Sequence, residues 1–239
     1  MPRRQFLGCA AGTVAMGLWR LGRSPVRADA SLTCVLLDLQ RHGGLVESLS
    51  GYEAALTAAG VRWMRAGAQS VSPSPSSSRR AVLIVPGALE IPLPAVQAIL
   101  SSLHAGASVI LESGAGFAAG RDFAAHQVVL REQLQLRVEA PVPLWSAPAR
   151  SRGIPYVDYT WPSPARIRDF SRVVPLGRQA GEIIARVDGL PVALKRQSGR
   201  GALIFLGSPL GPALWAGDGE ARRWLCDVVA RTEALPMAR

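Results

Sequence analysis

The chain has 239 residues, of which 49% are hydrophobic and 18% charged, enough apolar material for one α/β domain with its own core. Its 27 basic and 17 acidic side chains give a net charge of +10, yet Lys195 is the single lysine. No run combines dense arginine with stacking aromatics, so we predict no nucleic-acid groove.

Residues 1–30 are typical of a targeting segment rather than of a fold. The twin arginines Arg3 and Arg4 precede an apolar stretch that ends at Trp19, and the sequence ADA at 28–30 has the form of a cleavage site. This segment resembles a twin-arginine (Tat) export signal. The resemblance implies that the Tat translocase is a transient partner and that the mature domain is periplasmic or secreted.

Two alternatives to cleavable export stay open at this stage. The segment could remain as an uncleaved membrane anchor, although its apolar stretch is shorter than the ~20 residues that a spanning helix needs. Cys9 could be read as a lipobox cysteine, but it lies ahead of most of the apolar run. Cleavage leaves one domain, residues 31–239, with 22 basic and 16 acidic side chains and with Cys34 and Cys226, for which free thiols are expected.

The mature chain alternates between strands and helices. Continuous apolar runs predict buried central strands at CVLLDL (34–39), AVLIVPG (81–87), SVILES (108–113) and ALIFLG (202–207), with a shorter strand at 61–66. Helical spacing predicts helices over 45–60, 92–106, 117–136 and 218–235. This order predicts an α/β fold with a parallel sheet and helices on both faces.

The second half of the chain differs from the first in composition. Residues 151–177 are rich in proline and aromatics and are expected to form an extended excursion. Asp188-Gly189 is a hairpin signal between two β segments, which predicts a C-terminal β-hairpin.

The segment RRAVLIVPGALEIPLPAVQAILSSLHAGASVILESGAGF, residues 79–117, resembles the core of class I glutamine amidotransferase-like domains, which are flavodoxin-like. GRGALIFLGSPLG, residues 199–211, is similar to the late strand that delivers the family's catalytic histidine and glutamate. Within the superfamily, the chain looks closest to divergent members near the biotin-protein-ligase N-terminal type and the sugar-associated amidotransferase-like domains. The resemblance implies a flavodoxin-like parallel sheet.

The catalytic positions of that family are not matched. The slot for the nucleophile cysteine falls at Ser113 or Gly114, and the late slot for histidine and glutamate reads Leu206-Gly207-Ser208-Pro209. An amidotransferase needs a thiolate and a base to form it. We therefore expect a catalytically silent domain.

Ser113 could still act as a nucleophile with another base. His42, which follows the first strand, is the favoured candidate because the carboxyl ends of parallel strands share one crevice. Glu112 or Asp38 could then orient the histidine, giving an exported serine hydrolase or amidase. His126 is expected to lie about two turns along the next helix, away from the strand tip.

Ser113 has two other interpretations. Ser113, Gly114 and Gly116 could be small because a strand and a helix approach closely there. Alternatively, the backbone amides at the start of the following helix could bind an anion.

A ligand crevice is expected at the carboxyl ends of the strands. Its candidate residues are Gly87, Glu90, Ser113, Gly114, Gly116, Gly207 and Ser208. Tyr156, Asp158 and Trp161 are candidates for a carbohydrate or peptide cleft, unless their rings only pack on the sheet. No cluster has metal-ligand spacing and no cofactor fingerprint occurs, so neither a metal nor a cofactor is expected.

The sequence thus favours an exported, catalytically silent domain that binds a small ligand or a protein partner. An exported serine hydrolase using Ser113 with His42 is the alternative, and a purely structural module is a third interpretation.

Overall fold

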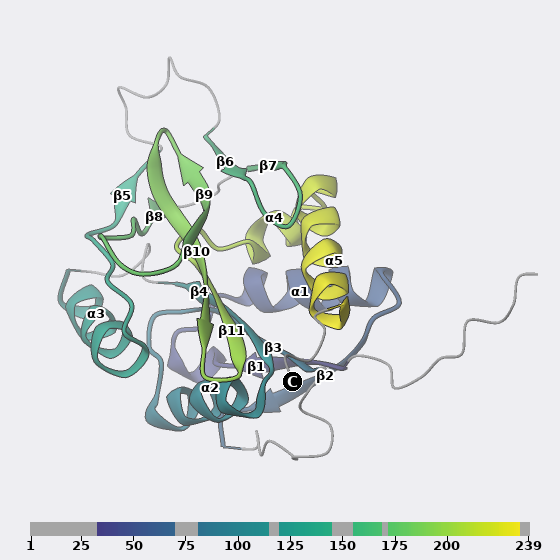
Figure 1. Ribbon diagram of the computed structural model, residues 1–239, viewed down its shortest axis with the longest axis horizontal. Helices are drawn as coiled ribbons and strands as arrows, with labels where there is room; N and C mark the ends of the chain where they lie inside the picture. Colours follow the sequence, from purple (N-terminus) through teal and green to yellow (C-terminus); the bar gives the residue numbers. More distant parts are fainter. Residues whose placement is uncertain (1–32, 70–80, 115–119, 145–154, 169–171, 235–239) are drawn as a thin grey trace, which may run out of the picture. The chain divides into compact units, whose positions relative to one another are not determined.

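The computed structural model describes residues 33–69, 81–114, 120–144, 155–168 and 172–234. These residues are organised around one nine-stranded sheet with the strand order β2-β1-β3-β4-β11-β10-β9-β6-β7 (Figure 1). The sheet is open, because β2 and β7 each have a neighbour on one side only. The expected export signal, residues 1–30, lies outside the described residues.

Five neighbouring strands of the sheet are parallel. They are β1 (Thr33–Asp38), β2 (Arg62–Gly67), β3 (Ala81–Ala88), β4 (Ser108–Ser113) and β11 (Gly201–Leu206). β3 and β4 are buried along almost their whole length, as expected for central strands that are covered on both faces. Their continuous apolar runs are the reason that these segments form the middle of the sheet.

The other four strands extend the sheet in antiparallel fashion. They are β10 (Leu190–Ser198), β9 (Glu182–Val187), β6 (Tyr156–Tyr159) and β7 (Ala165–Arg168). β9 and β10 are joined through Asp188 and Gly189, which have φ values of 46° and 84° and so form a left-handed turn.

The prediction of a flavodoxin-like parallel sheet is therefore wrong, because the sheet is mixed. In β6 and β7, buried and exposed residues alternate, which is typical of antiparallel strands with one face toward solvent. Each of these strands buries only two residues, too few to reveal a strand in a proline-rich sequence.

A second, small sheet pairs β5 (Val142–Pro143) with β8 (Arg172–Val173).

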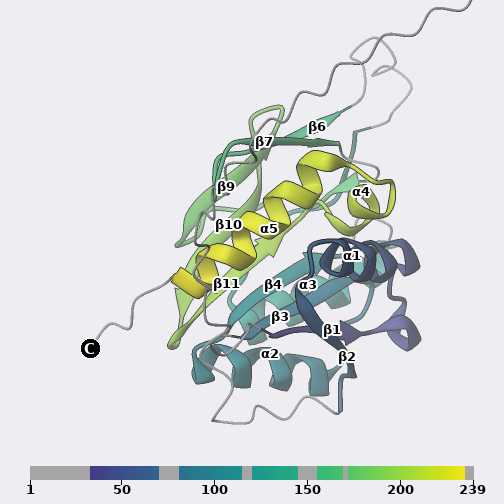
Figure 2. The ribbon, with the colours of Figure 1, turned by 90° about the vertical axis from the view of Figure 1, so that its right-hand side faces the viewer.

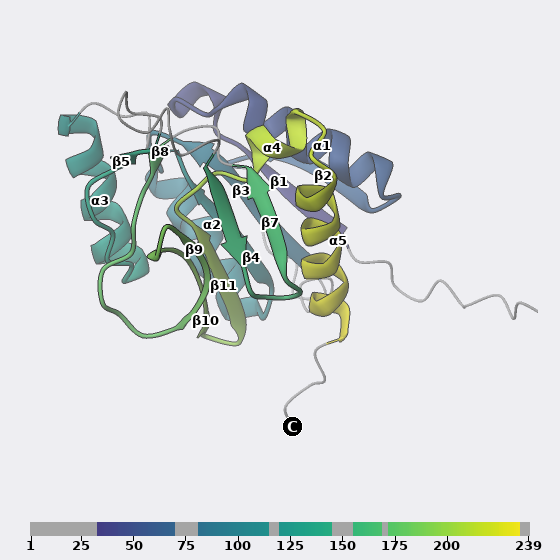
Figure 3. The same ribbon diagram turned by 90° about the horizontal axis from the view of Figure 1, so that it is seen from above.

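Helices cover both faces of the large sheet (Figures 2 and 3). α1 (Val46–Ala58), α4 (Gly211–Trp215) and α5 (Gly219–Ala234) pack on one face, and α2 (Leu93–Ala105) and α3 (Gly120–Leu134) pack on the other. A short 3-10 helix, η1 (Gln40–His42), follows β1. The two faces hold separate apolar clusters, one around Tyr52 and Trp224 and the other around Leu130 and Phe205.

Candidate functional site

The candidate site lies where β4 ends in the middle of the parallel strands. Its last two residues, Glu112 and Ser113, are each only 1% exposed to solvent. Successive side chains of a strand point to opposite faces of the sheet. One strand end therefore places a carboxyl group in one helical layer and a hydroxyl group in the other.

Glu112 accepts five hydrogen bonds. The donors are the hydroxyls of Ser48 and Tyr52, at 2.5 and 2.6 Å, and the backbone amides of Gly87, Leu210 and Gly211, at 2.9, 2.7 and 2.9 Å. These donors come from α1, from β3 and from the start of α4. A single buried carboxyl group thus ties three elements to β4.

Burial and hydrogen bonding act on this carboxyl group in opposite directions. Burial raises the pKa of Glu112, and the hydrogen bonds from Ser48, Tyr52 and the two glycine amides offset part of that increase. The pKa of the Tyr52 phenol is raised well above its ordinary value, first by burial and then by the neighbouring Glu112. Tyr52 therefore stays protonated and remains a donor.

Two glycines allow α1 and α4 to approach closely enough for this network. A Cβ atom on Gly211 would lie 2.3 Å from the Cα atom of Ser48, and one on Gly51 would lie 2.2 Å from the carbonyl oxygen of Gly211. Neither position accommodates a side chain without movement of the backbone. The small residues are needed for the amides of α4 to reach Glu112.

Ser113 meets a histidine on the opposite face of the sheet. Its Oγ atom lies 3.1 Å from Nε2 of His126, in α3, and the Nδ1 atom of His126 lies 3.2 Å from the carbonyl oxygen of Leu89. A carbonyl oxygen can only accept, so Nδ1 carries the hydrogen and Nε2 can accept the Ser113 hydroxyl hydrogen.

Burial lowers the pKa of His126 from 6.5 to about 4. The imidazole is 2% exposed and neutral at physiological pH. The pair has the tautomer of a serine nucleophile with its general base, but the group behind the ring is the Leu89 carbonyl and not a carboxylate.

The expectation that His126 lies away from the strand tip is wrong, and Ser48 and Tyr52 were not foreseen from the sequence. Ser48 and Tyr52 are four residues apart and so lie on one face of α1, the buried face. His126 lies between Phe123 and Leu130 on the buried stripe of α3, at the spacing that a helix requires. This apolar periodicity was the available signal that His126 faces the sheet rather than solvent.

The crevice expected at the carboxyl edge is bridged by backbone. In open α/β sheets a ligand binds where the strand order reverses, which here is the point between β1 and β3. At this point the Leu45 amide donates to the Gly87 carbonyl at 2.8 Å, and the Leu89 amide donates to the Gly43 carbonyl at 3.2 Å. The segments that follow β1 and β3 are thus hydrogen-bonded to each other where a ligand would enter.

The structure does not bring His42 to the Ser113–His126 pair. The His42 ring lies 3.8 Å from the carboxylate of Glu90, and the two side chains are 37% and 75% exposed. The amide of Glu90 also donates to the His42 carbonyl, at 3.1 Å. His42 and Glu90 therefore form a surface contact.

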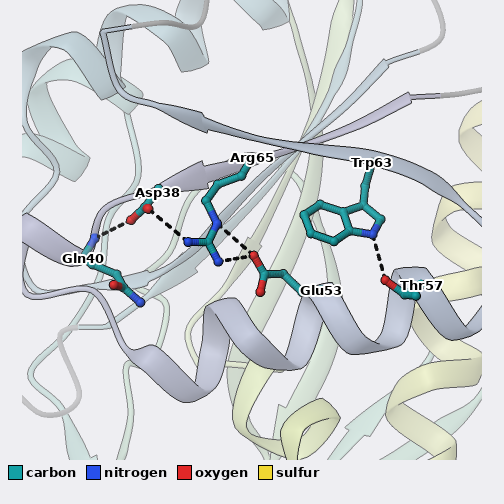
Figure 4. Close-up of polar contacts among 6 residues, drawn as sticks. All are labelled: Asp38, Gln40, Glu53, Thr57, Trp63 and Arg65. Atoms are coloured by element: carbon teal, nitrogen blue, oxygen red, sulfur yellow. Dashed lines mark hydrogen bonds and ion pairs between the residues drawn. The ribbon is translucent and has the colours of Figure 1, made fainter.

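Asp38, the other acid considered for a triad, belongs to a polar cluster between β1, β2 and α1 (Figure 4). It accepts the Gln40 amide at 3.0 Å and lies 3.6 Å from the guanidinium of Arg65. Arg65 also donates from Nε to Glu53 at 2.9 Å. Trp63 donates to the Thr57 hydroxyl at 3.0 Å in the same cluster. This cluster joins the edge strand β2 to α1.

The glycines expected to line the crevice serve internal packing. A Cβ atom on Gly114 would lie 2.5 Å from the backbone of Ala88, and one on Gly207 would lie 2.1 Å from the Val174 carbonyl oxygen. Gly116 lies outside the described residues. Ser208 is described and buried.

Tyr156 and Asp158 lie on β6 in the antiparallel part of the sheet, and Trp161 lies in the connection between β6 and β7. The Arg166 guanidinium lies 4.8 Å from the centre of the Tyr156 ring and 3.5 Å from Asp158. The Lys195 ammonium lies 4.4 Å from the centre of the Trp161 ring. These aromatic rings are half-buried and already carry cationic neighbours.

The described residues contain neither a metal-binding cluster nor a membrane-spanning helix. Among the residues that the structure describes, no group of three or more His, Cys, Asp or Glu side chains could hold a metal ion. No helix within the described ranges is long and apolar enough to cross a membrane.

The chain is similar to several solved structures. They include a β-galactosidase from Bacillus circulans sp. alkalophilus (TM-score 0.62, 12% identity, 87% of this chain and 32% of that chain). An exo-β-1,4-mannosidase from Opitutaceae bacterium strain TAV5 has a TM-score of 0.57 and 13% identity over 87% of this chain and 37% of that chain. A cytoplasmic protein from Salmonella typhimurium LT2 has a TM-score of 0.56 and 9% identity over 84% of this chain and 99% of that chain. No protein-family model and no curated protein matches the sequence.

At these identities the similarity concerns the fold alone. The chain spans about a third of the two glycosidases and nearly the whole of the Salmonella protein. The predicted membership of the glutamine amidotransferase-like superfamily is wrong, because the similar structures are described as glycosidases and a cytoplasmic protein. The resemblance rested on a local strand–turn–helix pattern that many α/β folds share.

Proposed function

We propose that this chain is an exported, non-catalytic domain that binds a ligand or a protein partner. The proposal rests on the observation that the polar groups at the carboxyl edge of the parallel strands bond to other groups of the protein. The Glu112 network and the backbone bridge between β1 and β3 occupy the place where an α/β enzyme keeps its reactants.

The burial of Ser113 supports the same conclusion. A nucleophile must reach its substrate, whereas Ser113 and His126 are 1% and 2% exposed. In addition, Ser113 is not among the described residues with a positive φ, whereas the serine of a nucleophile elbow is held in a strained backbone conformation. These features favour a packing role for the pair.

The similar structures are consistent with a modular role. A domain of this fold makes up about a third of the length of two glycosidases, and it makes up almost all of the Salmonella protein. The fold therefore occurs both within larger chains and nearly alone, and a binding role is compatible with either setting.

A serine hydrolase is the second candidate, and the contact between Ser113 and His126 favours it. In that mechanism the Ser113 oxygen would attack an acyl carbon while its proton passes to Nε2 of His126. The bond from the acyl carbon to the leaving group would then break, and the leaving group would depart with that proton. The pair offers the nucleophile and the base, and it lacks a carboxylate behind the ring.

A fluorophosphonate probe separates the two candidates. We expect no labelling of the full chain, because Ser113 is enclosed. Labelling that disappears in Ser113→Ala and persists in Ser108→Ala, a control at the other end of the same buried strand, would establish the hydrolase instead.

Export is tested separately. A reporter fused to residues 1–35 should reach the periplasm, and replacement of Arg3 and Arg4 by lysine should block its transport. Normal transport of the double-lysine variant would refute the twin-arginine interpretation.

A further inference from the structure

A basic hollow lies at the C-terminal end of α3, away from the carboxyl edge of the parallel strands. Its volume is about 540 Å³, and it is lined by Arg131, Gln135, Arg137, Gln179, Ala180 and Arg196. We call these six residues the arginine hollow. These six described residues supply three guanidinium groups and two primary amides, and none of the six carries a carboxylate.

We propose that the arginine hollow binds a small molecule that carries a phosphate group. Three guanidinium groups around one cavity repel one another unless an anion lies between them, and guanidinium groups recognise phosphate oxygens by paired hydrogen bonds. The volume lies within the range of ordinary small-ligand sites. The proposal rests on the binding role proposed above and names its site and ligand class.

The walls of the hollow are held in place by hydrogen bonds. The Gln179 side chain accepts the Arg137 amide at 3.1 Å and donates to the Arg137 carbonyl at 2.8 Å. The Gly177 amide donates to the same carbonyl at 3.0 Å. The two chain segments that carry Arg137 and Gln179 are thus fixed to each other without the use of the Arg137 guanidinium.

Arg196 is positioned by the end of α3. Its guanidinium donates to the carbonyl of Gln135 at 2.9 Å and also to the carbonyl of Leu134. A guanidinium has five N–H donors, so these two bonds leave others for a ligand. Gln135 has a φ of 52°, and this left-handed residue ends the helix and turns the chain toward Arg137.

Two carboxylates lie near the hollow. Glu132 is beside Arg131, and Oε1 of Glu139 is 3.8 Å from the position that a Cβ atom on Gly177 would take. Within the described part of the chain, no carboxylate pairs with Arg137 or Arg196. Arg131 lies 3.5 Å from Glu132, but both side chains are mostly exposed, so that pair is weak. Burial lowers the pKa of the half-buried Arg196 from its ordinary value, as expected for a cation with no counter-charge in contact.

Pyrophosphate is a suitable probe because it presents the phosphate chemistry without a specific organic group. Isothermal titration of the full chain, at an ionic strength held constant with sodium chloride, should give saturable binding with a Kd of about 1 mM or below. Arg137→Gln should weaken this binding by about tenfold or more, since it removes an exposed guanidinium that bonds to none of the described residues. Circular dichroism checks that the variant stays folded.

Arg62→Gln is the matched control, because Arg62 is an exposed arginine on β2, at an edge of the sheet away from β10. Its affinity should stay within about twofold of the parent. Equal weakening in both variants would show that pyrophosphate responds only to the net charge of the protein, which would overturn the proposal. The absence of saturation up to about 10 mM pyrophosphate would also overturn it. Neither binding measurement depends on Ser113. Absence of pyrophosphate binding would therefore overturn the phosphate site alone, whereas labelling by the fluorophosphonate probe would overturn the proposed non-catalytic function.

Discussion

Replacement of Glu112 by glutamine tests the network at the end of β4 with almost no change in volume. The five partners of Glu112 are all donors, and three of them are backbone amides that cannot reverse their role. The amide nitrogen of glutamine is itself a donor. It would replace one of the two carboxylate oxygens of Glu112 and would then face hydrogen-bond donors instead of an acceptor.

The less costly orientation places this nitrogen at the Oε2 position. Oε1 would then keep its bonds from Tyr52, Leu210 and Gly211, and the Ser48 hydroxyl can rotate to accept. The Gly87 amide cannot rotate and loses its acceptor in a buried place. An unsatisfied buried donor costs about 1–3 kcal/mol, and loss of charge-assisted bonds adds to that figure.

Relief of a buried charge offsets part of this cost. We therefore expect Glu112→Gln to lower the free energy of unfolding by about 2–4 kcal/mol, measured by urea titration of the full chain. Glu47→Gln, the same change at an exposed position of α1, should alter it by less than about 0.5 kcal/mol. A loss for Glu112→Gln no larger than that of the control would refute the reasoning.

Two other predictions concern the same region. Burial lowers the pKa of His126 from 6.5 to about 4, so between these pH values the unfolded chain takes up a proton that the folded chain does not. The contribution of His126 to the free energy of unfolding is therefore complete above pH 6.5 and falls by about 3 kcal/mol as the pH drops toward 4. Urea titrations across this pH window should show that His126→Gln loses this part of the pH dependence, and equal slopes in both proteins would contradict the assignment. Gly211→Ala should lower the unfolding free energy by about 2–3 kcal/mol through its contact with Ser48, whereas Gly219→Ala, where a Cβ meets nothing within 4 Å, should leave the melting temperature nearly unchanged. Similar effects for both glycine variants would contradict the proposed close approach of α1 and α4.

Local patterns in the sequence located many elements but not the direction of the strands. β3 and β4 lie in the middle of the sheet because their apolar residues follow one another without alternation, so that both faces of each strand can be buried. The turn at Asp188-Gly189 is encoded locally, since both residues adopt positive φ values. In contrast, β6 pairs with β9, far along the chain, and a four-residue strand carries no local sign of such a partner.

The site shows the same limit. The sequence predicts Ser113 at the end of a strand, but the expectation of His42 as its partner rested on proximity along the sheet edge. The partner in the structure is His126, because α3 packs with its buried stripe against the sheet. The donors to Glu112 were not foreseen, since two of them are backbone amides of a segment 98 and 99 residues further along the chain.

The end of β4 also explains why polar residues at this edge need not indicate catalysis. Glu112 binds α1 and α4 on one face, and one residue later Ser113 binds α3 on the other. A catalytic carboxyl or hydroxyl group keeps some hydrogen-bonding capacity for its substrate, whereas Glu112 gives both of its oxygens to five internal donors. The strand end therefore acts as the polar junction of two helical layers. The proposed ligand binding is therefore expected at a surface whose charges are not already paired, such as the arginine hollow.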